Sequence, residues 1–77
     1  MKYLEISEEW ANCLWQVGAE VNIAVYQGVY GNDFVKEYTK SKPSGTSWTL
    51  AWQVKEILKG LPNNRHYTFK FYERVKD

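Results

Sequence analysis

The stretch TSWTLAWQVKEILKGLP, residues 46–62, predicts a helix in a chain whose other segments are mostly strand-like. Thr46 or Ser47 can cap its start, and Gly60-Leu61-Pro62 can end it. At about 100° per residue, one side of this helix collects the apolar residues Leu50, Ala51, Val54, Ile57, Leu58 and Leu61. The other side carries Trp48, Trp52, Lys55 and Lys59. We therefore expect these tryptophans to be covered by another part of the chain or by a partner protein.

Four other segments of the chain show the alternation of β-strands. They are residues 2–6 (KYLEI), 21–27 (VNIAVYQ), 34–40 (FVKEYTK) and 66–75 (HYTFKFYERV). The last segment alternates most clearly, with Tyr67, Phe69, Phe71 and Val75 on one face and Thr68, Lys70, Tyr72 and Arg74 on the other. A turn at 28–33 separates the middle two segments, and KPSG at 42–45 breaks the pattern before the tryptophan-bearing helix.

Residues 7–18 (SEEWANCLWQVG) admit two interpretations. The preferred one is a helix that Ser7 caps and Gly18 ends, with Glu8 and Glu9 suiting its positive first turn. Its apolar stripe would be Trp10, Cys13, Leu14 and Val17, which leaves Trp15 off the centre of the stripe. The alternative is a strand over 10–17 that enters a hairpin at Gly18-Ala19.

The preferred order is β-α-β-β-α-β, a ferredoxin-like α+β domain with an antiparallel four-stranded sheet and its helices on one face. The alternative order is β-β-β-β-α-β. In the ferredoxin-like arrangement the open face of the sheet would carry Tyr3, Tyr26 and Tyr72, near the basic residues Lys2, Lys70 and Arg74. It would also carry one of two sets from the third strand, either Phe34/Lys36/Tyr38 or Val35/Glu37/Thr39.

Composition narrows the class of protein. Seventy-seven residues make one domain, 1–77, and a formal net charge of +1 is low for a protein that depends on phosphate contacts. With one cysteine and one histidine, an internal disulfide and a structural zinc site are both excluded. We expect no cofactor and no metal. The sequence has neither the apolar run of a membrane span nor a signal peptide, so the cytosol is the expected compartment.

No set of residues predicts catalysis, so we expect the protein not to be an enzyme. His66, the single histidine, is expected to be an exposed side chain at a strand end. Cys13 is expected to be a buried, inert thiol on the apolar side of the first helix. The adjacent Glu8 and Glu9 are expected to interact with the helix dipole and not to act as an acid/base pair.

Two surfaces remain as candidate binding sites. One is the tyrosine-bearing sheet face, which in combination with basic residues resembles the base-stacking face of RNA-recognition modules. The other is the tryptophan and lysine face of the helix at 46–62, which predicts a protein partner. The surplus of aromatic residues and the low net charge favour protein binding, and a single-stranded nucleic-acid binder is the alternative function. The protein could be a monomer or a homodimer.

The stretch NIAVYQG (22–28), with MKY at the start and KGLP at 59–62, resembles phage-encoded anti-CRISPR proteins that inhibit the type I-F surveillance complex. In that family a tyrosine that closes the NIAVY strand and a glutamate eleven positions later contact the Cas backbone subunits. The matching positions here are Tyr26 and Glu37, and Tyr3 is a looser counterpart of a further tyrosine. The resemblance implies a non-enzymatic viral inhibitor in the host cytoplasm that binds a Cas ribonucleoprotein complex and blocks target DNA. It also favours a hairpin over 8–27.

Overall fold

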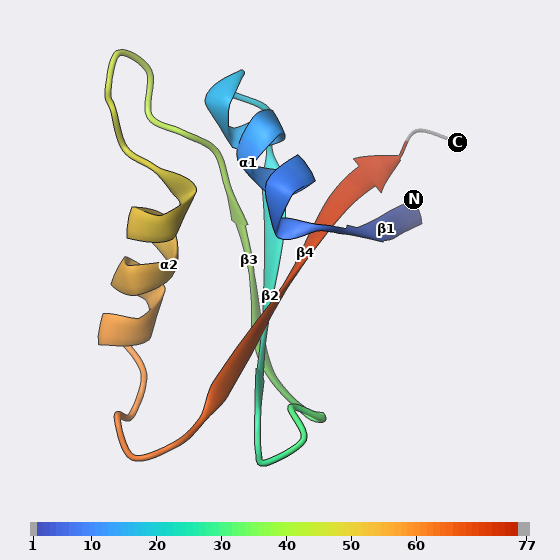
Figure 1. The fold of residues 1–77 in the computed structure, drawn as a ribbon, viewed down its shortest axis with the longest axis vertical. Coiled ribbons are helices and arrows are strands. Elements are labelled where there is room, and N and C mark those ends of the chain that lie inside the picture. The colour runs from blue at the N-terminus through green and yellow to red at the C-terminus, as the bar shows by residue number, and fades with distance from the viewer. Residues whose placement is uncertain (1, 76–77) are drawn as a thin grey trace.

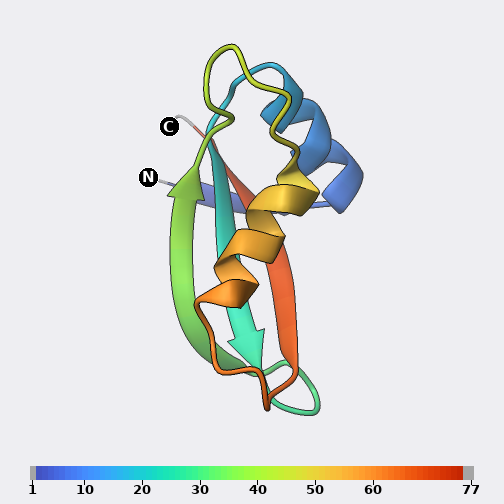
Figure 2. The same ribbon diagram turned by 90° about the vertical axis from the view of Figure 1, so that its left-hand side faces the viewer.

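The computed structural model describes residues 2–75 and contains six elements. They are β1 (Lys2–Ile6), α1 (Glu8–Gln16), β2 (Val21–Gln27), β3 (Asp33–Lys40), α2 (Leu50–Lys59) and β4 (Tyr67–Val75). The strands form one antiparallel sheet in the order β1-β4-β2-β3 (Figure 1). Both helices lie on the same side of this sheet (Figure 2). The predicted α+β, ferredoxin-like order is confirmed, and residues 8–16 form a helix and not a strand of a hairpin.

The two inner strands, β2 and β4, supply the floor of the core. Ile23 lies opposite Phe71, and Val25 lies opposite Phe69, so these pairs face the helices together. Ile6 of β1 also lies opposite Phe71 and packs against the same cluster. Because side chains alternate along a strand, the residues between these positions lie on the open face of the sheet.

The helix α1 begins where the sequence predicts but turns a different face to the core. Ser7 caps it by accepting a hydrogen bond of 3.1 Å from the backbone N–H of Trp10. The buried residues are Ala11 and Trp15, whereas Trp10 and Val17 of the predicted stripe are exposed. The prediction that Trp15 lies off the stripe is wrong, because its side chain is 0% exposed. The reason is tertiary: the carbonyl of Trp48, in the segment before α2, accepts a hydrogen bond from the indole of Trp15, so this side of α1 faces the core.

The helix α2 is shorter than predicted and has a different cap. Thr49, and not Thr46 or Ser47, accepts the hydrogen bond from the backbone N–H of Trp52, at 3.1 Å. Thr46 is used elsewhere, because its hydroxyl donates to the carbonyl of Pro43 at 2.8 Å. Gly60 ends the helix as predicted. The buried stripe is also narrower than predicted: Leu50 and Ile57 are buried, Val54 and Leu61 are half-buried, and Ala51 and Leu58 are exposed.

The β2–β3 hairpin contains a β-bulge, which the sequence analysis did not predict for the third strand. Val25 lies opposite Lys36, but the next residue of β2, Tyr26, lies opposite Phe34. The extra residue, Val35, packs against the core on the same side as Tyr38. As a result Phe34 and Glu37 share the open face although three positions separate them, which strict alternation along the strand would not allow. The expected sets Phe34/Lys36/Tyr38 and Val35/Glu37/Thr39 are therefore both wrong as sets.

Candidate functional site

The open face of the sheet gathers the aromatic side chains that the sequence assigned to it. Tyr3 lies opposite Arg74 in the β1–β4 pair, and Tyr72 lies between Glu5 of β1 and Asn22 of β2. Tyr26 comes from the far end of β2. Lys70 and Arg74 belong to this face as predicted, but Lys2 does not, because it alternates with Tyr3 along β1 and shares the side of Leu4 and Ile6.

These side chains surround a hollow of about 140 Å³ on the open face. We call it the aromatic hollow, and its lining residues are Tyr3, Ala24, Tyr26, Phe34, Glu37 and Tyr72. Ala24 lies at the centre of the arrangement, with Lys70 directly opposite on β4 and Glu37 directly opposite on β3. The hollow exists because alanine is short where the neighbouring positions of the face carry large side chains.

The walls of the aromatic hollow are held by contacts among themselves. The rings of Tyr26 and Phe34 meet edge to face, with centroids 5.7 Å apart and an interplanar angle of 72°. The ammonium group of Lys70 lies 5.0 Å from the centroid of the Tyr26 ring, within the range of a cation–π interaction. Tyr26 is therefore packed between two neighbours, although Phe34 and Tyr3 remain 58% and 46% exposed.

The neighbouring groups around the hollow change the pKa of Tyr72. Side-chain hydrogen bonding with Tyr26, partial burial and the nearby carboxylates of Glu5 and Glu37 raise the pKa of the Tyr72 hydroxyl above its ordinary value of 10.0. Each of these causes favours the neutral phenol over the phenolate. The carboxylates thus make this part of the face unfavourable for additional negative charge.

A buried amide lies beside the hollow. Asn22 is 1% exposed and accepts a hydrogen bond of 2.8 Å from the hydroxyl of Thr39, its partner across the β2–β3 pair. Its Nδ2 group has no hydrogen-bond partner within residues 2–75. A buried hydrogen-bond donor without a partner is uncommon and lowers the free energy of unfolding. The Asn22 amide group therefore destabilises the sheet at this position.

The second predicted surface, the tryptophan and lysine face, is only partly formed. Trp48 precedes α2 and is half-buried against the core, and its indole donates to Gln53 at 3.2 Å. Trp52 remains 51% exposed, with the Lys55 ammonium 5.3 Å from its ring centroid. Lys59 pairs with Glu56 at 3.0 Å. The chain therefore covers Trp15 fully and Trp48 partly, and leaves Trp52 and Lys55 available to a partner.

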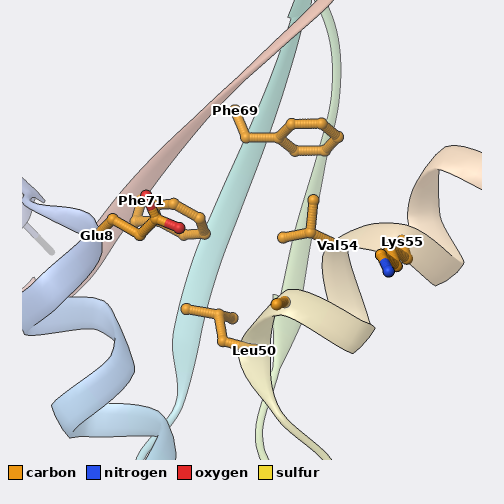
Figure 3. A pocket seen from close by; sticks show the side chains of 7 residues that line it. Glu8, Leu50, Val54, Lys55, Phe69 and Phe71 are labelled. Atoms are coloured by element: carbon orange, nitrogen blue, oxygen red, sulfur yellow. The ribbon is translucent and has the colours of Figure 1, made fainter.

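A third feature lies on the helix side of the sheet. A hollow of about 370 Å³ opens between α1 and α2 above β4, and Figure 3 shows Phe69, Phe71, Leu50 and Val54 around it. Its other lining residues are Ala51 and the charged, exposed Glu8 and Lys55. This hollow lies where neither helix covers the core side chains of β4.

The candidate reactive side chains are not assembled into a catalytic site. His66 is exposed, as predicted, beside a hollow of about 250 Å³ next to the β2–β3 turn. Cys13 is exposed, so the prediction of a buried thiol is wrong, because the rotation of α1 turns it away from the core. Among residues 2–75, no group of three or more His, Cys, Asp or Glu side chains could hold a metal ion. Over the same range, neither helix is long and apolar enough to span a membrane.

Sequence reasoning found Tyr3, Tyr26, Glu37 and Tyr72 but missed two residues of the aromatic hollow. Ala24 carried a signal, because it is the smallest residue of a strand otherwise built from large side chains. Phe34 was weighed only in a set that excludes Glu37, and the bulge that joins them left no local sequence signal that we identify.

Comparison with protein-family models, with curated proteins and with solved structures finds no match for this chain.

Proposed function

We propose that the protein is a non-catalytic inhibitor that binds another protein through the open face of its sheet. The observation that carries this proposal is the meeting of Tyr3, Tyr26 and Glu37 around one hollow. Tyrosine is enriched among the residues that dominate binding energies at protein interfaces. The contacts of Tyr26 with Phe34 and Lys70 hold it in place before binding, which lowers the entropic cost of association.

The charge of this face favours a protein partner over a nucleic acid. Lys70 and Arg74 are positive, but Glu5 and Glu37 lie on the same face and Glu37 lines the hollow itself. Nucleic-acid sites concentrate positive charge because each phosphate carries a negative one. A face with both signs matches the mixed polar rim of a protein interface better.

For the partner we propose a CRISPR–Cas effector complex, with the protein acting as a phage anti-CRISPR in the cytoplasm of a bacterial host. The support is the resemblance over NIAVYQG: its Tyr26, and Glu37 eleven positions later, match the family's contact residues and lie on the same face of the sheet. A small rigid domain on the surface of such a complex would block target DNA sterically, without chemistry of its own.

The test is binding of the tagged protein to a purified type I-F surveillance complex, followed by a measurement of target DNA binding. We expect the wild type to be retained and to prevent DNA binding, and Tyr26→Ala/Glu37→Ala to lose both effects. Trp52→Ala is the matched control, because it removes an exposed aromatic residue from the other side of the molecule. Circular dichroism of each variant ensures that it is folded.

Two other outcomes would change the proposal. Absence of retention on the complex would remove the anti-CRISPR partner. Loss of binding with Trp48→Ala/Trp52→Ala alone would move the site to the α2 side.

Single-stranded nucleic acid is the second candidate ligand, because Tyr3, Tyr26 and Tyr72 share a face with Lys70 and Arg74. This function predicts quenching of tyrosine fluorescence by single-stranded DNA or RNA at low salt, and steep weakening as salt rises. Unchanged fluorescence at low salt would exclude it.

A further inference from the structure

The aromatic hollow combines two features that attract positive charge. Its walls include one ring from each of the four strands: Tyr3 on β1, Tyr26 on β2, Phe34 on β3 and Tyr72 on β4. The face of each aromatic ring carries partial negative charge, which attracts cations. The remaining wall is the carboxylate-bearing side chain of Glu37.

A lysine side chain of the protein itself already contacts one ring of the hollow. The ammonium group of Lys70 lies 5.0 Å from the centroid of the Tyr26 ring. Lys70 is next to the hollow, opposite Ala24, but is not part of its lining. One ring of the hollow therefore interacts with a cation from the chain itself, while the remaining rings and Glu37 still face the open space.

The size of the hollow restricts what can enter. Its volume of about 140 Å³ lies below the roughly 300 to 1,000 Å³ of sites that bury a drug-sized ligand. It has room for the end of one side chain. Its position in the middle of an exposed, aromatic sheet face suits a side chain that projects from a larger docked surface.

We infer that the aromatic hollow receives the positively charged end of a lysine or arginine side chain of the partner protein, with Glu37 as its counter-ion. This inference rests on the proposed function, since it specifies the partner's chemistry at the same face. An anionic group is disfavoured by Glu37 and by Glu5, whose charges already raise the pKa of Tyr72. A neutral apolar group would leave the Glu37 carboxylate beside it without a partner.

The experiment follows the backbone amide resonances of the full chain during titration with small probes. The cationic probes are N-acetyl-arginine amide and N-acetyl-lysine amide. The neutral probes are N-acetyl-citrulline amide, which matches arginine in length, and N-acetyl-norleucine amide, which keeps the alkyl chain of lysine without its ammonium group. N-acetyl-glutamate is the anionic probe. We expect the cationic probes to shift the resonances of Ala24, Tyr26, Phe34 and Glu37, with an affinity at least about fivefold above that of the neutral probes.

Two variants test whether the probe occupies the hollow. Glu37→Gln removes the charge at an exposed position of β3, and we expect it to abolish the preference for cationic over neutral probes. Ala24→Leu fills the floor of the hollow, and we expect it to abolish the shifts for every probe. Glu20→Gln is the matched control, because Glu20 is an exposed glutamate outside the hollow, in the segment before β2, and we expect it to bind as the wild type does.

Equal shifts with norleucine and lysine probes would overturn the inference, as would stronger shifts with the glutamate probe. An absence of shifts in the hollow with all probes at tens of millimolar would overturn it too. The outcome is separable from that of the proposed function. Cationic probes that bind while the type I-F complex is not retained would support the cation site and remove only the proposed partner. Retention of the complex by Glu37→Gln with unchanged affinity would leave the inhibitor intact and overturn the cation site.

Discussion

The indole Nε1 of Trp15 donates a hydrogen bond of 2.7 Å to the backbone carbonyl of Trp48. This bond joins α1 to the segment that leads into α2, across 33 positions of the chain. Trp15 is fully buried, so the bond satisfies an indole N–H that would otherwise be isolated in the core. The contact therefore ties the two helices together on the one side of the sheet that they share (Figure 2).

We expect Trp15→Phe to destabilise the protein by about 2 kcal/mol or more, because it leaves the carbonyl of Trp48 without its partner and creates a void. Urea unfolding followed by circular dichroism measures this change. The control is Trp52→Phe, which alters a half-exposed ring and should change the free energy of unfolding by less than about 0.5 kcal/mol. Equal effects of the two substitutions would contradict the assignment of Trp15 to the core.

For the hydrogen-bonded pair Thr39 and Asn22, we expect a single substitution to destabilise the protein more than the double substitution does. Thr39→Val removes the only donor to the buried Asn22 oxygen within residues 2–75 and should cost about 1 to 3 kcal/mol. Asn22→Leu/Thr39→Val replaces both groups with apolar ones of similar shape and should be close to neutral or stabilising, since it also removes the unpartnered Nδ2. Chemical unfolding of the four proteins of the cycle gives the coupling energy. A coupling energy of zero would contradict the expected contribution of this hydrogen bond to stability.

The start of α2 can be located by removing hydroxyl groups one at a time. Thr49→Ala should lower the free energy of unfolding by about 1 kcal/mol, because Thr49 caps the helix through the N–H of Trp52. Ser47→Ala should have little effect, since Ser47 is exposed and lies before the cap. Urea unfolding of both variants measures the difference. The reverse order of effects would restore the helix start suggested by the sequence.

Because the pKa of Tyr72 is raised, we expect the folded protein to lose stability at alkaline pH. An unfolded tyrosine loses its proton near pH 10.0, whereas folded Tyr72 keeps it to higher pH because Tyr26, burial and two carboxylates favour the neutral form. Between these two pKa values the unfolded state binds fewer protons than the folded state, so stability falls as pH rises above 10. The change is absent below that pH, where both states are protonated.

Tyrosinate absorbance measures the titration of Tyr72 as the difference between the wild type and Tyr72→Phe. Tyr26→Phe should lower the pKa of Tyr72 most, because Tyr26 is its largest cause, and Glu37→Gln should lower it less. Tyr30→Phe is the control, since Tyr30 is 86% exposed at the β2–β3 turn. A pKa of Tyr72 that stays the same in Tyr26→Phe would contradict the arrangement of side chains around the hollow.

The order and approximate bounds of the six elements follow from local patterns in the sequence. Alternation identified the strands, and Ser7 and Gly60 were predicted as the residues that begin α1 and end α2. These signals are local because a strand's two faces and a helix's caps depend on residues within a few positions of one another. The assignment of Tyr3, Tyr26 and Tyr72 to the open face follows from the same alternation.

Tertiary structure alone decided the rotation of α1, the partial burial of Trp48, and the placement of Phe34 and Glu37 on one face of the sheet. Trp15 is buried because a segment 33 positions away offers its indole a carbonyl, which no periodicity within α1 reveals. The aromatic hollow exists because a bulge in β3 places Phe34 and Glu37 on one face beside the short side chain of Ala24. Alternation in one strand cannot predict a shift in its pairing with another, since the shift depends on how both strands pack against the helices.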